Sequence, residues 1–133
     1  MPAVFKQIIT VEEKHIDQLG HVNNLVYLQW ASAVSKMHWE QLADEAMRAP
    51  LLWVMGRQEI DYLKELKLAQ QVRIETWVAQ CEKQKCFRHI LFYDDGRNEL
   101  AAKALITWVL LDAATKKPMR ISTGLVQLFE AGS

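Results

Sequence analysis

The chain has 133 residues, half of them hydrophobic, and its 16 basic residues balance its 16 acidic ones. This length and apolar content suffice for one core, so we expect a single domain over residues 1–133. Balanced charge leaves no excess of positive residues for a run of phosphates, which argues against binding nucleic acid or an anionic membrane. We find no apolar run of about 18 residues and no signal segment, so we expect a cytoplasmic chain that does not span a membrane.

Cysteine and histidine spacing argues against a metal centre. The only cysteines, Cys81 and Cys86, flank a predicted hairpin turn. A disulfide there is geometrically conceivable, but a cytoplasmic location favours two reduced thiols. The four histidines are scattered without the spacing of zinc ligands. We therefore expect neither a metal ion nor another cofactor.

The first predicted strand covers residues 3–13, where β-branched and aromatic residues are mixed with polar ones. A loop over residues 14–23 follows. Residues 24–47 lack Gly and Pro and carry Tyr27, Trp30, Val34 and Met37 at helical spacing, which predicts the one long helix with these side chains in the core. Pro50 ends that region, because the residue before a proline is pushed out of helical geometry.

After Pro50 the apolar period changes to two. Four strands are predicted, at about residues 51–63, 71–82, 85–94 and 98–111. Short links at residues 83–84 and 94–97 join neighbours that must be antiparallel, since parallel strands need a long crossover. Ser122 can cap a short amphipathic helix at the end of the chain. One sheet must then bury one largely apolar helix, which is an α+β architecture.

The segment from Asp17 to Trp30, DQLGHVNNLVYLQW, lies between the first strand and the long helix. It resembles hotdog-fold thioesterases of the 4-hydroxybenzoyl-CoA thioesterase type, which carry Asp-x-x-Gly in this position. The HVNN form is most similar to the acyl-ACP and acyl-CoA thioesterase branches. The resemblance extends to residues 60–62 and 112–118 and covers nearly the whole chain. It implies a hotdog fold, in which the antiparallel sheet wraps around the central helix.

The resemblance also implies a thioesterase that hydrolyses acyl-CoA or acyl-ACP, with Asp17 as the catalytic carboxylate. An aspartate can deprotonate water as a general base or attack the thioester carbon directly, and the sequence leaves both routes open. The Asn24 N–H, at the positive end of the helix, would polarise the thioester carbonyl. Gly20 would let the loop pass close to the substrate, because it lacks a Cβ and tolerates positive φ.

Several further residues are candidates for substrate binding, each with a simpler structural explanation. His21 could contact substrate or serve as a general base, but packing or hydrogen bonding would also account for it. Asn23 and Asn24 are equally explained as helix caps, and Tyr27 as a core residue. Asp17 itself could serve only to satisfy backbone N–H groups of its loop.

Three cations near one hairpin, Lys83, Lys85 and Arg88, are candidates for binding the phosphates of coenzyme A. A solvated charged turn explains them equally well.

Hotdog domains pair edge to edge, so the resemblance implies a homodimer or homotetramer with the site at the subunit interface. Unpaired edge strands lead to the same expectation. Two other functions stay open: an acyl-thioester hydratase or dehydratase, and a non-catalytic acyl-thioester binding module. Related dehydratases place an Asn between Asp and His, whereas His21 here precedes Asn23. The intact Asp17 argues against a mere binding module.

Overall fold

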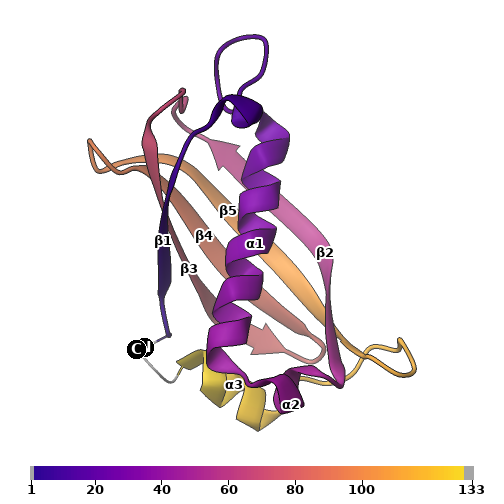
Figure 1. Ribbon diagram of the computed structural model, residues 1–133. Helices are drawn as coiled ribbons and strands as arrows, with labels where there is room; N and C mark the ends of the chain where they lie inside the picture. Colours follow the sequence, from indigo (N-terminus) through magenta and orange to yellow (C-terminus); the bar gives the residue numbers. More distant parts are fainter. Residues whose placement is uncertain (1, 131–133) are drawn as a thin grey trace.

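A long helix lies across one face of an antiparallel sheet, as Figure 1 shows for the computed structural model, which describes residues 2–130. The predicted α+β class is confirmed. A 3₁₀ turn at Glu13–His15 precedes the first long helix. The elements are β1 (Phe5–Thr10), α1 (Asn24–Leu42), α2 (Glu45–Arg48), β2 (Leu51–Tyr62), β3 (Gln71–Glu82), β4 (Lys85–Asp94), β5 (Glu99–Asp112) and α3 (Thr123–Glu130).

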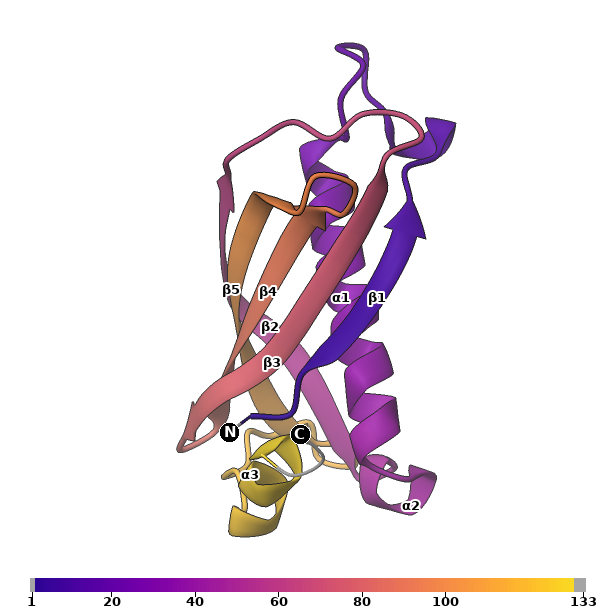
Figure 2. The same cartoon turned by 90° about the vertical axis from the view of Figure 1, so that its left-hand side faces the viewer.

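The five strands form one sheet in the order β1-β3-β4-β5-β2, and all pairings are antiparallel. The period-two pattern sets which side chains face the helix: in β4, Cys86, Arg88, Ile90, Phe92 and Asp94 are buried while the residues between them are partly exposed. The sheet curves around α1, with β1 at one edge and β2 at the other (Figure 2). Both edge strands therefore carry one unpaired side within the chain.

Helix α1 supplies the other half of the core. Tyr27, Trp30, Ala31 and Val34 are all at most 9% exposed and pack against the sheet. Met37 differs from its predicted core position, because it is 38% exposed. The apolar surface of α1 is thus wider than the face that the sheet covers.

The predicted helix over residues 24–47 is in fact two helices. Ala43 has extended geometry, with ψ of 135°, and ends α1. Asp44 then caps α2, its side chain accepting a hydrogen bond from the Met47 N–H at 2.9 Å. The break therefore rests on a polar cap inside a segment that contains no Gly or Pro, so the composition alone gave no stop signal before Pro50.

Cys81 and Cys86 form a disulfide, so the expectation of two reduced thiols is wrong for this structure. The two residues are direct partners in the β3–β4 ladder, with Cα atoms 4.1 Å apart. The expectation of reduced thiols came from the expected cytoplasmic location, whereas the pairing in the hairpin brings the two sulfur atoms together. The expected cap of α3 is confirmed, since Ser122 Oγ accepts a hydrogen bond from the Leu125 N–H at 3.2 Å.

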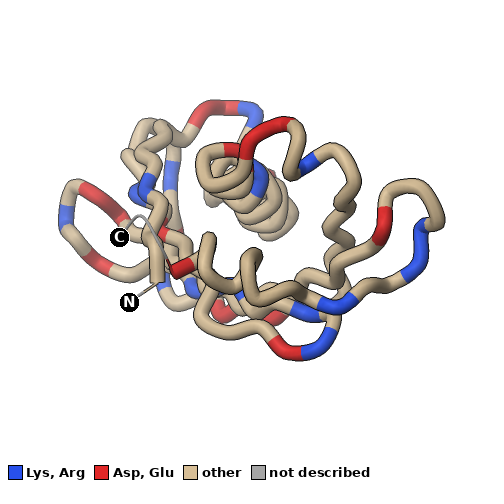
Figure 3. The backbone as a smooth tube through the Cα atoms, turned by 90° about the horizontal axis from the view of Figure 1, so that it is seen from below, with Lys and Arg blue, Asp and Glu red and all other residues tan. Residues whose placement is uncertain are grey.

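Charged residues of both signs are interspersed along the chain (Figure 3). None of the helices in residues 2–130 combines the length and the apolar character needed to cross a membrane.

Candidate active site

The loop between β1 and α1 contains a tight turn built around Asp17. An antiparallel bridge joins Ile16 to Val22, the Asp17 N–H donates to the His21 carbonyl at 2.9 Å, and the Gly20 N–H donates to the Asp17 carbonyl at 3.1 Å. Gly20 adopts the expected positive φ, at +80°, and a Cβ there would meet no atom within 4 Å. Glycine is thus used at this position for its backbone conformation.

The Asp17 carboxylate is fixed by the same turn. Its Oδ1 accepts hydrogen bonds from the Leu19 N–H at 2.9 Å and from the His21 N–H at 3.3 Å. Oδ2 has no hydrogen-bond partner among residues 2–130. Asp17 therefore does satisfy its own loop, as the structural explanation holds, while one carboxylate oxygen stays available for another partner.

The N-terminus of α1 follows directly. Asn23 is the cap, and its Oδ1 accepts a hydrogen bond from the Leu25 N–H at 2.9 Å. The Val26 N–H donates to the Asn23 carbonyl. The Asn24 N–H has no acceptor in the described part of the chain, and it lies where the helix dipole is positive. An unpaired donor at a helix N-terminus suits a carbonyl oxygen that gains negative charge.

His21 precedes the Asn23 cap by two residues and contacts residues of the segment between β2 and β3. Its Nε2 is 3.1 Å from Glu65 Oε2, and its backbone bridges to Lys67. The imidazole thus already has an acidic partner, which accounts for its orientation without any substrate.

Tyr27 lies in the core, 3% exposed, with edge-to-face contacts to Trp30, Tyr62 and Phe92. Burial, and secondarily the neighbouring Tyr62, raises the pKa of Tyr27 to about 12, so the phenol stays neutral. The structural explanation of Tyr27 therefore fits its surroundings better than direct substrate contact does.

The three hairpin cations do not lie together. Lys83 and Lys85 are exposed at the β3–β4 turn, which lies at the opposite end of the sheet from the Asp17 loop of the same chain (Figure 1). Arg88 is 3% exposed and points inward toward α1. The explanation of Arg88 as part of a solvated charged turn is therefore wrong. The alternation Cys86, Arg88, Ile90, Phe92 was the signal that placed Arg88 on the buried face.

Between α1 and the sheet, Arg88 contacts two residues that were not among the predicted site residues. Its Nη1 is 2.9 Å from His38 Nδ1 and 3.1 Å from Thr76 Oγ1. Because a guanidinium only donates, Nδ1 must accept, and His38 is neutral. Burial and the nearby Arg88 charge lower the pKa of His38 to about 4. His38 follows Val34 by one helical turn, which was the available signal for its buried position.

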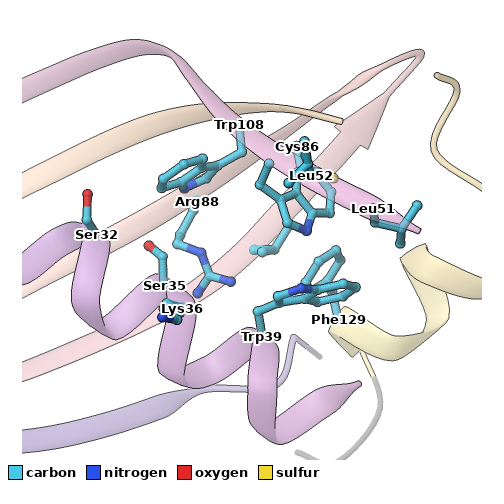
Figure 4. Close-up of a pocket in the computed structure, with 12 residues that line it drawn as sticks. Ser32, Ser35, Lys36, Trp39, Leu51, Leu52, Cys86, Arg88, Trp108 and Phe129 are labelled. Carbon is cyan, nitrogen blue, oxygen red and sulfur yellow. The ribbon is translucent and has the colours of Figure 1, made fainter. Parts of the chain in front are cut away.

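Arg88 also lines a cavity of about 410 Å³ between the second half of α1 and the sheet. Figure 4 shows the guanidinium extending toward α1 beside Ser35 and Lys36. Apolar walls come from Trp39, Trp53, Val78 and Phe129. None of the sequence-predicted site residues other than Arg88 lines this cavity.

Residues 2–129 match the family described as acyl-ACP thioesterase N-terminal domain. The chain therefore belongs to this family. No curated protein matches the sequence closely enough to count as a relative.

Solved structures share the fold over nearly all of the chain. A putative oleoyl thioesterase from Lactobacillus plantarum superposes with a TM-score of 0.87 at 16% identity, over 96% of this chain and 51% of that one. The chain thus spans about half the length of that protein. YbaW, a probable thioesterase from Escherichia coli, gives 0.81 at 22% identity, over 94% and 96% of the two chains. A Thermus thermophilus thioesterase complexed with coenzyme A and zinc gives 0.81 at 24% identity, over 95% and 92%. The hotdog fold expected from the sequence is confirmed.

Proposed function

We propose that this chain hydrolyses acyl thioesters of coenzyme A or acyl carrier protein to the free acid and the thiol, with Asp17 as general base or nucleophile. Asp17 Oδ2 would take a proton from water or form a bond to the thioester carbon. The Asn24 N–H would donate to the carbonyl oxygen as negative charge develops there. Gly20 and Asn23 would shape this end of the site, and His21 would border it.

One observation carries the proposal: a carboxylate with a free oxygen and a helix N-terminus with a free N–H are joined by one short turn. Oδ1 is held by two backbone N–H groups, so the carboxylate keeps its orientation without a substrate. The Asn24 N–H is unpaired within residues 2–130. Fixed donors and a fixed carboxylate need little reorganisation when the reaction begins.

Asp17→Asn is the sharpest test, because the amide oxygen can still accept from the Leu19 and His21 N–H groups while the charge and the nucleophile are lost. We expect kcat for acyl-CoA hydrolysis to fall by roughly 10²–10⁴-fold, the usual range for loss of a general base. KM should change little, since the lost interaction acts mainly on the transition state.

A matched control is Asp44→Asn, the same change at a capping aspartate whose Oδ1 accepts from the Met47 N–H. It should retain wild-type kcat. A folded Asp17→Asn protein with near-normal kcat would remove Asp17 from the mechanism. Assaying enoyl-CoA hydration in the same samples would reveal a hydratase instead.

The proposal extends to a cytoplasmic homodimer or homotetramer with the site between subunits. Within one chain the Asp17 loop lies far from Lys83 and Lys85 (Figure 1). These two lysines would therefore contact coenzyme A phosphates only at a neighbouring subunit's site. Assays with acyl-CoA and with acyl-ACP of equal chain length would identify the carrier.

A further inference from the structure

The cavity beside α1 carries positive charge without negative charge. Two cations, Arg88 and Lys36, contribute to its lining, and among residues 2–130 no Asp or Glu does. Most of the remaining wall is aromatic or aliphatic. An apolar pocket with a few polar groups is the usual form of a small-molecule site.

Arg88 is the more unusual of the two cations, because it is only 3% exposed. Its hydrogen-bond partners, His38 and Thr76, are both uncharged. No carboxylate of the described residues lies within ion-pair distance of its guanidinium. Burial lowers the pKa of Arg88 to about 10, so the group stays charged at neutral pH. A buried cation without a counter-ion is costly, and proteins pair such charges.

A second polar group in the same wall also lacks a partner. Trp108 Nε1 is buried and has no hydrogen-bond acceptor among residues 2–130. Tryptophan N–H groups usually find an acceptor when buried. The wall thus contains a charge without its counter-ion and a donor without its acceptor, and both deficits are of the kind that an anionic oxygen ligand removes.

We propose that this cavity binds an apolar chain that ends in a carboxylate, with the carboxylate oxygens accepting hydrogen bonds from the Arg88 guanidinium. The planar guanidinium matches a carboxylate in geometry and can donate two parallel N–H bonds to it. Lys36, exposed at the cavity, adds attraction for an anion. The rings of Trp39, Trp53 and Phe129 would enclose the apolar part of the ligand.

Two sources of this chemistry differ in how the ligand lies. One is a free long-chain carboxylate. The other is the distal carboxylate of a dicarboxylic acyl thioester, which rests on the proposed function. Ser32 and Ser35 follow Asn24 by 8 and 11 residues on the same helix. At about 1.5 Å per residue, the cavity begins roughly 12–16 Å from the helix start, a separation that a long acyl chain can span.

The first experiment measures binding without hydrolysis. Decanoate and decanol, below their aggregation concentrations, are titrated into the wild-type protein by calorimetry, with tryptophan fluorescence as a second readout. We expect decanoate to bind at least tenfold more tightly. Equal affinities, or no binding of either, would overturn the proposal, and this comparison needs no variant.

Variants then locate the source of the preference. Arg88→Met keeps an apolar stem of similar length and should remove the preference for decanoate while decanol still binds. Lys36→Met is the matched control at an exposed cation, and this variant should keep most of the preference for decanoate over decanol. Retention of the preference by Arg88→Met would contradict the proposal. So would a changed oligomeric state of that variant without a change in ligand preference, since Arg88 would then be serving an acidic group of a second subunit.

Hydrolysis separates the two sources. Wild-type kcat/KM for dodecanedioyl-CoA above that for dodecanoyl-CoA, with the difference lost in Arg88→Met, would assign the site to the distal carboxylate of the substrate. Equal kcat/KM values alongside tight decanoate binding would assign it to a free carboxylate. Hydrolysis of neither thioester would count against the proposed function, while the binding measurement would still decide the cavity.

Discussion

The contact between Arg88 and His38 couples two protonation states. Arg88 donates to His38 Nδ1 at 2.9 Å, so the imidazole must be neutral for the contact to hold. His38 is 2% exposed and also stacks on the Phe5 ring, with centroids 5.7 Å apart. Protonation would place a second positive charge beside the guanidinium in an apolar setting, which is why the pKa of His38 falls to about 4.

This lowered pKa predicts a loss of stability in acid. Between pH 6.5 and 4 the unfolded chain holds a proton on His38 and the folded chain does not, so the free energy of unfolding decreases as the pH falls through this window. At about 1.4 kcal/mol per pH unit the loss approaches about 3 kcal/mol at pH 4. Urea unfolding at several pH values measures it.

Carboxylates titrate in part of the same window, so the informative quantity is the difference between wild type and His38→Gln. Glutamine can accept from Arg88 through its carbonyl oxygen but does not titrate. Its stability should fall less steeply from pH 6.5 to 4. Identical slopes for the two proteins would mean that His38 titrates normally in the folded state.

At the scale of elements, periodicity alone predicted most of the fold. The change from helical to period-two spacing after Pro50 gave β2, β3, β4 and β5 to within a residue or two, because a half-buried strand must alternate. The positive φ of Gly20 and the cap by Asn23 were also predictable from local chemistry. For the candidate site, local chemistry therefore predicted the turn at Gly20 and the cap at Asn23, whereas the catalytic role of Asp17 rests on the resemblance and stays a prediction.

Other features could not be read from local patterns. The break at Ala43 depends on the extended backbone of that residue and on the Asp44 cap that follows it, and helical spacing does not report either. The contact between Arg88 and His38 joins residues 50 positions apart in the sequence. Predicting this contact would have required knowing how α1 is placed along the sheet. Met37 continued the apolar pattern of α1, yet it is 38% exposed, and helical spacing does not report how far the sheet covers the helix.

Val34 and Met37 provide a direct test of how α1 is covered. Val34 is 1% exposed and Met37 is 38% exposed. Val34→Asp should destabilise the protein by several kcal/mol, because it buries a charge without a partner. Met37→Asp should lower the melting temperature only slightly. A comparable loss in the two variants would mean that a partner covers the Met37 side of α1 in the assembled protein.

At the scale of the whole molecule, the sheet has two different free edges. β1 is 6 residues long and β2 is 12, so β2 offers the longer row of unpaired backbone groups. Leu52 and Val54 are exposed on β2, at 38% and 45%. At its far end, the Tyr62 hydroxyl lies 3.5 Å from the Asn24 carbonyl, so the β2 edge adjoins the start of α1. An interface along β2 would therefore border the candidate active site.

We predict that the chains associate through the free edge of β2. The wild-type protein should sediment at micromolar concentration as a species of two or four chains of 15.4 kDa each. Val54→Lys places a charge on the β2 edge and should shift the protein toward monomer, with loss of hydrolysis if the site spans two subunits. Ile8→Lys is the matched control, since Ile8 is also an exposed aliphatic residue, at 53% against 45% for Val54, on the opposite edge strand β1. It should leave both mass and activity unchanged. A wild-type monomer that hydrolyses acyl-CoA would show that one chain holds the whole site, and dissociation by Ile8→Lys alone would move the interface to β1.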